Sequence, residues 1–345
     1  MKTQNLSTLF KTSLIASAMA MVVGCSDTNV PGTATSTASG QAFDWYISGA
    51  TVYPDFNKDG IQQTGNEVTY ATTTDETGSY TLTIPGELGT NYDVVVTGGT
   101  DTATNQPFTG TLKAGPSDTK ATPATTLKQA FVKAGLDEAA ATDKVKTFLG
   151  IPADSDIAND DPETPSLFAA NLKANSLINS LSESIKSASS NSSDSGVSQK
   201  SSSLAVDSLV KALENSTTTI DDVSGTGTEF DDVIDSAMDE AANTIIAESG
   251  STEDDANFKA QLKANAKSVA KEAVTSAKTE ADTIATSTAP VTQADAKTAQ
   301  ETQATNVTSA KTNADSSNPI TIKAKITAPA LPTVPSTVSG ATAGN

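Results

Sequence analysis

The chain has 345 residues with 41 acidic and 22 basic side chains, one cysteine and no histidine. The lack of histidine excludes Ser-His-Asp and Cys-His catalysis and histidine zinc sites, and no glycine-rich phosphate loop occurs. A net charge of −19 argues against nucleic acid as a partner, because binding to phosphates needs a cationic surface. Acidity of this degree suits solubility and divalent cations instead.

The amino terminus has the pattern of a signal peptide over residues 1–24. Lys2 and Lys11 flank a polar start, and residues 12–23 are apolar or small but too few to cross a bilayer as a mature helix. The run VVGC, ending at Cys25, resembles the lipobox of bacterial lipoproteins. That resemblance implies cleavage before Cys25, a diacylglycerol on its sulfur, and palmitate or a similar acyl chain on its new amino group. Several acyl chains would then anchor the protein stably to a membrane.

The residue after the cysteine bears on location. Ser26 stands where lipoproteins of the inner membrane have aspartate, so the resemblance implies an outer membrane lipoprotein that faces the periplasm or the cell surface. Because Cys25 is the only cysteine, disulfides cannot hold the mature chain together. Residues 25–42 are small and polar, and we expect them to form a flexible tether.

Residues 43–115 carry the signals of β-structure. The runs ISGATVY, EVTYATTT, SYTLTI, YDVVVTG and QPFTGTLKA are short, rich in Thr, Val, Tyr and Ile, and separated by Gly, Asn, Asp and Pro. They predict a small antiparallel β-sandwich or open barrel. Trp45, beside Tyr46, is interpreted as a core anchor rather than a platform for a sugar. Asp75 and Gly78 predict a hairpin turn.

An acidic loop interrupts these strands. Asp55, Asn57 and Asp59 occupy alternate positions and are followed by Gly60, which lets the chain turn and offer the carbonyl of Ile61. A loop that coils around an ion points every second side chain inward, and a hard cation prefers such oxygens. The alternative interpretation is a solvated turn that uses Asp and Asn for their turn preference and binds nothing.

The two motifs ISGATVYPDFNKDGIQQTGNE and TTTDETGSYTLTIP occur in this order over residues 47–85. They resemble the prealbumin-like modules of bacterial surface proteins, including calcium-binding B-type repeats and carboxypeptidase regulatory-like domains, and the likeness covers roughly residues 46–97. It implies a calcium site with these ligands: Asp55, Asn57, Asp59, the carbonyl of Ile61, and Glu67. Glu67 is thirteenth in the loop where the pattern has its carboxylate twelfth, and Gln63 replaces an aspartate. We therefore expect weak affinity, about 10⁻⁴ to 10⁻³ M.

The remainder of the chain has helical periodicity. The expected divisions are a helical subdomain at 123–188, a serine-rich linker at 189–203, a helical region at 204–289, and a low-complexity tail at 290–345 with an edge strand at 320–326. The acids of residues 152–165 are interpreted as a solvated loop rather than a second ion site. The apolar stripes predict packing in a loose bundle, with binding to a membrane surface as the alternative.

Together these signals predict an α+β protein, in which a small antiparallel β-sandwich precedes a loose all-α region with disordered linkers. The predicted function is that of a noncatalytic, lipid-anchored envelope or cell-surface protein whose calcium-stiffened β-module acts in adhesion or as a structural stalk. The alternative is an envelope accessory module that binds a polysaccharide or a protein partner through its helical part. A carboxylate-based hydrolase is a third, weaker interpretation, because the acids lie in turns and on helix faces.

Overall fold

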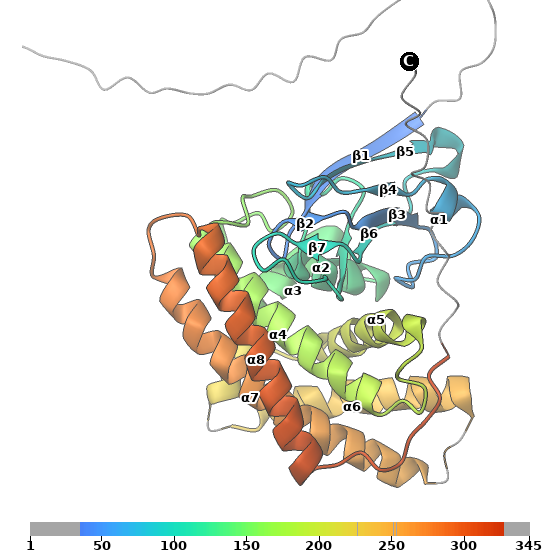
Figure 1. Ribbon diagram of the computed structural model, residues 1–345, viewed down its shortest axis with the longest axis vertical. Helices are drawn as coiled ribbons and strands as arrows, with labels where there is room; N and C mark the ends of the chain where they lie inside the picture. Colours follow the sequence, from blue (N-terminus) through green and yellow to red (C-terminus); the bar gives the residue numbers. More distant parts are fainter. Residues whose placement is uncertain (1–34, 226, 251, 253, 328–345) are drawn as a thin grey trace, which may run out of the picture. The chain divides into compact units, whose positions relative to one another are not determined.

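A computed structural model describes residues 35–225, 227–250, 252 and 254–327 (Figure 1). The fold is α+β, as predicted, with 15% of residues in strands and 53% in helices. The predicted signal peptide, Cys25, the first part of the predicted tether and the end of the predicted tail lie outside the described residues. No helix in the described part of the chain is long and apolar enough to cross a membrane.

The described strands make three sheets, which we call the β-module together with their loops (residues 35–121). Their orders are β5-β1-β9, β4-β3-β6-β8 and β2-β7, and all pairs except the parallel β1 and β9 are antiparallel. The strands are β1 Thr35–Ala42, β2 Ile47–Ser48, β3 Thr51–Asp55, β4 Thr72–Thr73, β5 Ser79–Pro85, β6 Asp93–Thr97, β7 Thr100–Asp101, β8 Thr111–Ala114 and β9 Lys120–Ala121.

The two larger sheets face each other across one apolar core, which makes the predicted small sandwich. Along β5 the buried residues alternate, because every second side chain of a strand points to the same face. Tyr80, Leu82 and Ile84 of β5 share a buried cluster with Val52 of β3 and Val96 of β6. A turn forms before β5, since Asp75 accepts hydrogen bonds from the backbone N–H groups of Thr77 and Ser79. It is not the predicted hairpin, because β4 and β5 on either side of it belong to different sheets.

Strand β1 corrects the predicted tether, which is wrong for residues 35–42. This segment has no apolar period, but its backbone pairs with β5 from Thr35 opposite Pro85 to Gln41 opposite Ser79. Small side chains make the close approach possible: a Cβ on Gly40 would lie 2.5 Å from the hydroxyl oxygen of Tyr80. The strand is therefore specified by its partner rather than by its own pattern.

A second difference concerns the predicted strand EVTYATTT. Its first half is the short helix α1 (Asn66–Thr69), and only β4 is extended. The side chain of Glu67 bonds back to the acidic loop, as described below, and this local interaction overrides the β-propensity of the run.

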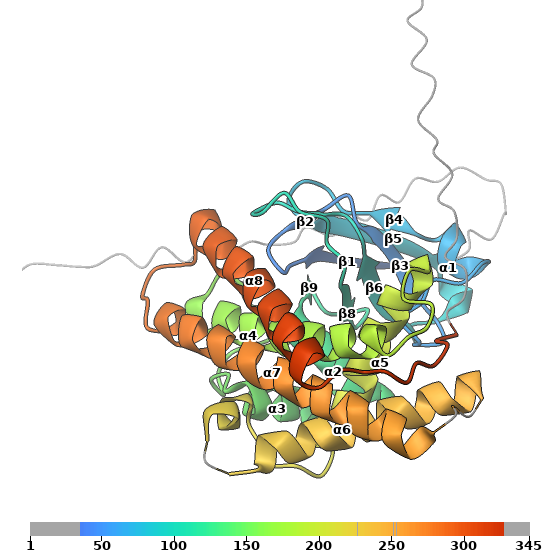
Figure 2. The ribbon, with the colours of Figure 1, turned by 60° about the horizontal axis from the view of Figure 1, so that its bottom comes forward.

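The described helices after the β-module form the helical body (residues 122–327). It consists of α2 Pro123–Lys133, α3 Glu138–Leu149, α4 Pro165–Ser187, α5 Ser195–Leu213, α6 Glu229–Ser249, α7 Asp255–Ala285 and α8 Gln293–Ser317, with short 3-10 turns at Ile220–Ser224 and, within the β-module, at Gly86–Leu88. Helix α2 lies between the sheets and the other helices (Figure 2). Side chains of Thr122, Asp137 and Thr292 cap helix starts, which explains where α2, α3 and α8 begin.

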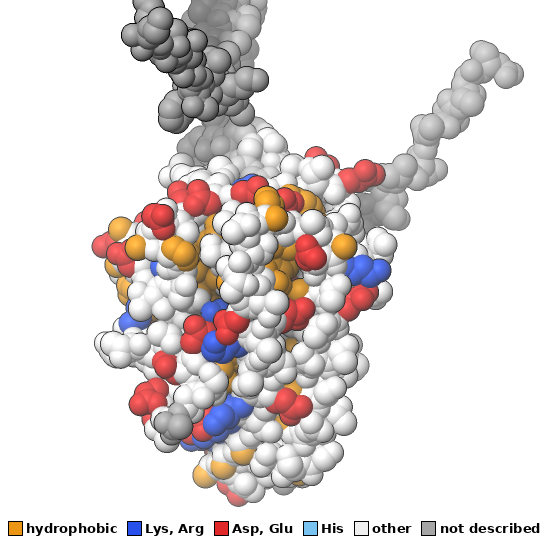
Figure 3. Space-filling model, turned by 90° about the vertical axis from the view of Figure 1, so that its left-hand side faces the viewer, with side chains coloured by type: hydrophobic (Ala, Val, Ile, Leu, Met, Phe, Trp, Pro, Cys, Tyr) orange, Lys and Arg blue, Asp and Glu red, His pale blue; other side chains and the backbone are white. Residues whose placement is uncertain are grey.

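One buried core runs through α2 to α7, so the predicted regions 123–188 and 204–289 are not separate units. The apolar stripes of α6 and α7 are covered, for example at Phe230, Met238 and Phe258, which supports bundle packing over membrane binding. The face in Figure 3 carries acidic and basic side chains side by side, unlike the strongly cationic face of an interfacial helix.

The predicted linker and edge strand are also corrected. Helix α5 begins at Ser195, inside the expected linker 189–203. Residues 320–326 do not extend the β-module: Ile320, Ala324 and Ile326 are buried in the helical core, and the Ala324 N–H donates to the carbonyl of Ala188. Within the predicted low-complexity tail, α8 lies against α7 through small side chains such as Ala310 and Ala314.

Candidate metal centre

The acidic loop (residues 55–67) begins at the end of β3 and ends in the first turn of α1. Asp55 is fully buried, and its Oδ2 accepts a hydrogen bond of 2.6 Å from the Gly60 N–H. Lys58 and Gly60 have φ values of 60° and 77°, so the backbone makes the sharp turn that the motif predicted. Burial raises the pKa of Asp55, although the charge of Lys113 and the Gly60 N–H lower it in part.

The next two predicted ligands are bonded within the loop. Asp59 Oδ1 accepts from the Ile61 N–H at 2.8 Å, and Asp59 Oδ2 accepts from the side-chain amides of Asn57 at 3.0 Å and Gln63 at 2.8 Å. Asn57 Oδ1 accepts from the Asp59 N–H at 3.2 Å. These oxygens therefore hold the coil of the loop in shape, as Asx turns do.

Glu67 closes the loop from the first turn of α1. Its Oε1 accepts from the Phe56 N–H at 3.2 Å and its Oε2 from the Gln63 N–H at 2.7 Å. Burial raises the pKa of the Glu67 carboxyl, with the charge of Asp55 adding to the effect. The extra residue before Glu67 is accommodated because the chain turns into a helix at Asn66.

Asp93 and Lys113 belong to this site but were not predicted. Asp93 is the antiparallel partner of Asp55 at the start of β6 and is 1% exposed. Burial raises its pKa to about 6, against the lowering charges of Lys113 and Lys58. A carboxylate at the head of the apolar run VVV is the one sequence signal that could have pointed to it. Lys113, on β8, is 3% exposed and its Nζ lies 3.5 Å from the carbonyl oxygen of Lys58.

Three carboxylate oxygens at this site lack hydrogen bonds. These are Asp55 Oδ1 and both oxygens of Asp93, of which Oδ1 lies 3.4 Å from Lys58 Nζ. Unpaired buried carboxylate oxygens are costly and are suited to a cation. However, among the described residues no three His, Cys, Asp or Glu side chains are placed so that they could hold a metal ion. Positive charge comes instead from Lys58 and Lys113.

Helix α5 covers the acidic loop. Gln199 Nε2 donates to the carbonyl of Gly60 at 2.9 Å and to the hydroxyl of Tyr53 at 3.2 Å, and Ser203 Oγ donates to the carbonyl of Asp59 at 2.6 Å. A Cβ on Gly60 would lie 2.9 Å from both Lys113 Nζ and Ser203 Oγ. The loop is thus part of the contact between the β-module and the helical body, which the sequence did not predict.

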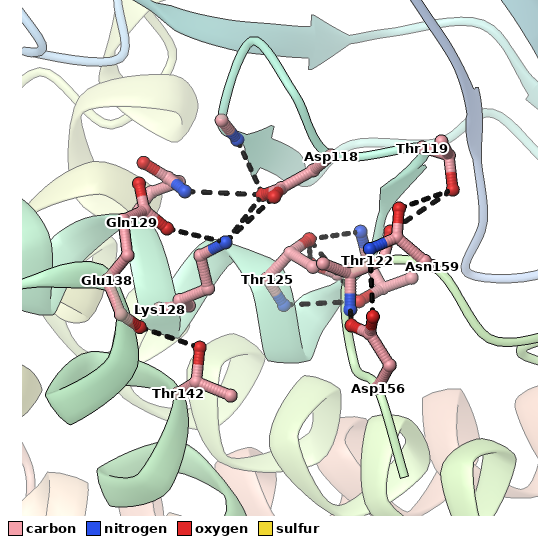
Figure 4. A network of polar contacts seen from close by, with 12 residues as sticks. Asp118, Thr119, Thr122, Thr125, Lys128, Gln129, Glu138, Thr142, Asp156 and Asn159 are labelled. Carbon is pink, nitrogen blue, oxygen red and sulfur yellow. Dashed lines mark hydrogen bonds and ion pairs between the residues drawn. The ribbon is translucent and has the colours of Figure 1, made fainter.

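A second polar network connects the β-module and the helical body and is fully paired (Figure 4). Lys128 on α2 is 4% exposed, and its Nζ lies 2.8 Å from Asp118 Oδ1 and 2.8 Å from Glu138 Oε2. Burial lowers the pKa of Lys128, but the hydrogen bonds and charges of Asp118 and Glu138 together outweigh burial, so the pKa is raised. In the acidic segment 152–165, Asp156 accepts bonds from the Ala158 N–H and the Asn159 side chain, as a turn-forming residue does.

Comparison with known proteins found no similar protein: no family model, curated protein or solved structure matches this chain. The likeness to prealbumin-like modules therefore remains a prediction from the two motifs. The interpretation of Trp45 is confirmed, since it is 4% exposed and its ring lies 5.2 Å from Phe43 and 6.2 Å from Phe168 in a buried cluster.

Proposed function

We propose that this protein is a noncatalytic lipoprotein of the outer membrane or cell surface, anchored through Cys25. Its β-module, of the prealbumin-like kind, would be stiffened by weakly bound calcium and would act in adhesion or as a structural stalk. The observation that supports a stiffening role is the contact of Gln199 and Ser203 on α5 with the backbone of the acidic loop. A cation bound in the loop would therefore stiffen the connections of the loop to β3, α1 and the helical body together.

The oxygen chemistry of the loop suits a hard cation. Asp55, Asn57, Asp59, Ile61 and Glu67 would hold it through carboxylate, amide and carbonyl oxygens, and Asp55 Oδ1 accepts no hydrogen bond. Because the acids are not grouped around one position in the structure, calcium would have to draw Asp59 and Glu67 toward Asp55. The charges of Asp55 and Asp59 each raise the pKa of Glu67, which reflects repulsion among the acids. Calcium would supply the charge that removes this repulsion, and the same residues would then fix the connection between β3 and α1.

Thermal unfolding with calcium and with EDTA tests the proposal. For a dissociation constant of 10⁻⁴ to 10⁻³ M, 10 mM calcium stabilises the folded state by about 1.4–2.7 kcal/mol. This corresponds to an increase in Tm of about 2–5 °C. The effect should disappear in Asp59→Asn and persist in Asp75→Asn, which alters a carboxylate in the turn before β5, outside the loop. Magnesium at equal ionic strength is the control. The absence of both a Tm shift and a heat of calcium binding would contradict the proposal.

A further inference from the structure

A cleft of about 740 Å³ lies between the β-module and the helical body. One wall consists of Asp44, Thr51, Thr97, Gly98, Asp101 and the loop 104–110 between β7 and β8. The other walls are faces of α4, α5 and α8. Pockets of ~300–1,000 Å³ are the size that binds small molecules. Neither the acidic loop nor its carboxylates line this cleft.

The lining is mostly uncharged and polar. It includes six amide side chains and eight hydroxyl groups, and its charged groups are four carboxylates and one lysine. An excess of acids repels anions such as phosphates, sulfates and uronic acids. The single lysine, Lys186, forms an ion pair of 3.6 Å with Glu183, so it does not offset this preference.

The amide side chains are held with their N–H groups turned toward protein oxygens. Asn175 donates to both carboxylate oxygens of Asp44 at 3.0 and 2.9 Å, and Asn179 donates to Asn175 Oδ1 at 3.1 Å. Gln303 donates to the carbonyl of Leu172 at 3.1 Å, and Gln199 donates to the β-module as described above. Since all these partners except Tyr53 Oη can only accept, the orientation of each amide is fixed.

The amide oxygens are consequently left as acceptors. Among the described residues, none donates a hydrogen bond to the side-chain oxygens of Asn179, Gln199 or Gln303. Gln300 gives its amide to the carbonyl of Asp44 and, at 2.9 Å, to Asp101 Oδ2, while its buried Oε1 has no partner. A molecule that enters the cleft therefore needs hydrogen-bond donors and no negative charge.

Asp44 and Asp101, two carboxylates that line the cleft, already accept hydrogen bonds from the protein, which disfavours a cation as the ligand. Asp101 accepts from the backbone N–H groups of Trp45, Ala103 and Thr104, and both oxygens of Asp44 accept from Asn175. Hydroxyl groups donate hydrogen bonds and carry no charge, so they match the unpaired amide oxygens of the cleft. Phe108 supplies an apolar surface in the same wall, where it packs against the sandwich core and beside Gly110.

We propose that this cleft binds a neutral oligosaccharide or a segment of a neutral polysaccharide. Sugar hydroxyls would donate to the fixed amide oxygens of α4, α5 and α8, and a C–H face of a sugar ring would contact Phe108. The proposal goes beyond the calcium-stiffened role and does not rest on it. No residue of the acidic loop lines the cleft, and Gln199, which lines the cleft, bonds to the loop only through its amide N–H group.

Binding can be measured on the full-length protein in a detergent without a sugar headgroup. An array of neutral, uronic-acid and sulfated glycans is screened first, and titration calorimetry then compares the neutral oligosaccharides bound on the array with spermine. We expect neutral glycans to bind and uronic-acid glycans and spermine to bind at least tenfold more weakly. Binding should be unchanged in EDTA, so failure of the calcium proposal leaves this result intact.

Two variants test the residues. Phe108→Ala and Asn179→Ala should each weaken binding of the neutral glycan at least tenfold. Tyr70→Ala, which removes a partly buried ring from the same core, and Asn257→Ala, on the exposed surface of α7, should not. Circular dichroism verifies folding, and if Phe108→Ala does not fold, Asn179→Ala decides. The proposal is overturned if no neutral glycan binds, if anions or spermine bind more tightly, or if both cleft variants bind as well as the controls.

Discussion

Two buried lysines with opposite surroundings show how single residues shape this protein. Lys128 has two carboxylate partners at 2.8 Å, whereas no described carboxylate lies within 4.0 Å of Lys113 Nζ. Lys113 still lowers the pKa of both Asp55 and Asp93, because charges act over longer distances when they are buried. The ammonium of Lys113 thus supplies part of the charge that a metal ion would bring.

The variant Lys113→Met tests this view. Removing the ammonium leaves Asp55 and Asp93 with less compensation. Because Lys113 forms no ion pair with a described carboxylate, the loss of stability should be smaller than the ~3–5 kcal/mol of a broken buried ion pair. We expect that loss in the free energy of unfolding, measured by urea titration in EDTA, and a larger stabilisation by calcium than in the unaltered protein. Lys120→Met, which removes a partly buried lysine bonded to Gln41, is the control. Equal stability and equal calcium response in the two variants would argue against the role of Lys113.

Asp44 should make stability depend on pH. Burial and the nearby charge of Asp101 raise its pKa to about 7, against the opposing bonds from Asn175. The folded state therefore keeps a proton that the unfolded chain loses near pH 4, so this contribution to stability is present below pH 4 and is lost as pH rises to 7. A shift of about three units equals ~4 kcal/mol in a dry site. Because Asp44 is only half-buried, we expect about 1–2 kcal/mol.

Asp44→Asn isolates this effect. The variant keeps a polar side chain of the same size. The difference in unfolding free energy between the variant and the unaltered protein should change by about 1–2 kcal/mol between pH 4 and pH 7. Urea titrations at pH 4, 5.5 and 7 provide the measurement. Taking the difference removes the contributions of other acids with raised pKa values, such as Glu280. A difference that is constant with pH would show that Asp44 titrates normally.

At the scale of elements, the sequence predicted those segments whose own residues form a recognisable pattern. The acidic loop, the turn at Asp75 and the helices with apolar stripes follow from local residues, and they form where expected. Strand β1 and the start of α5 did not follow, because serine, threonine and glycine give no apolar period. In the site, Asp55 was predicted from the spacing of the loop residues and Glu67 from the resemblance to prealbumin-like modules. Asp93 and Lys113 were not predicted, because they lie on β6 and β8 and reach the loop only through sheet register.

Close packing explains why a serine-rich segment is helical. Ser176, Ser180 and Ser184 on α4 are fully buried, as is Ser201 on α5. Small side chains let two helices approach closely, and the hydroxyls of Ser180 and Ser184 bond to backbone carbonyls one turn earlier. A composition that is typical of a flexible linker therefore serves here as a packing surface.

Ser180→Leu tests the closeness of this contact. The larger side chain has no space, and overpacking costs typically 1–3 kcal/mol, which should appear as a lower urea midpoint with an unchanged slope. Ser316→Leu, on the exposed surface of α8, makes the same chemical change and should alter stability by less than about 0.5 kcal/mol. Equal stability of the two variants would mean that the surroundings of Ser180 on α4 are not closely packed in solution.

At the scale of the whole molecule, the β-module and the helical body share buried surface. Phe43 and Trp45 from the β-module, Phe168 from α4 and Val291 and Ala299 from the α8 region form one cluster. Hydrogen bonds also connect the two parts: Gln300 on α8 donates to Asp101, and Gln199 on α5 donates to the acidic loop. A division near residue 120 would expose this cluster, so we expect the two parts to unfold together rather than as separate domains.

Trp45 reports on this connection because it is the only tryptophan and lies in the shared cluster. During urea unfolding, its fluorescence should change at the same concentration as the far-ultraviolet circular dichroism, which follows mainly the helices of α2 to α8. Two separate midpoints would instead mean that the β-module unfolds independently, as a stalk on a flexible connection would. Trp45→Phe gives the fluorescence background. Coincident transitions would mean that the sheets and helices form one cooperative unit, which holds the cleft between them and which the proposed lipid anchor would attach to the membrane.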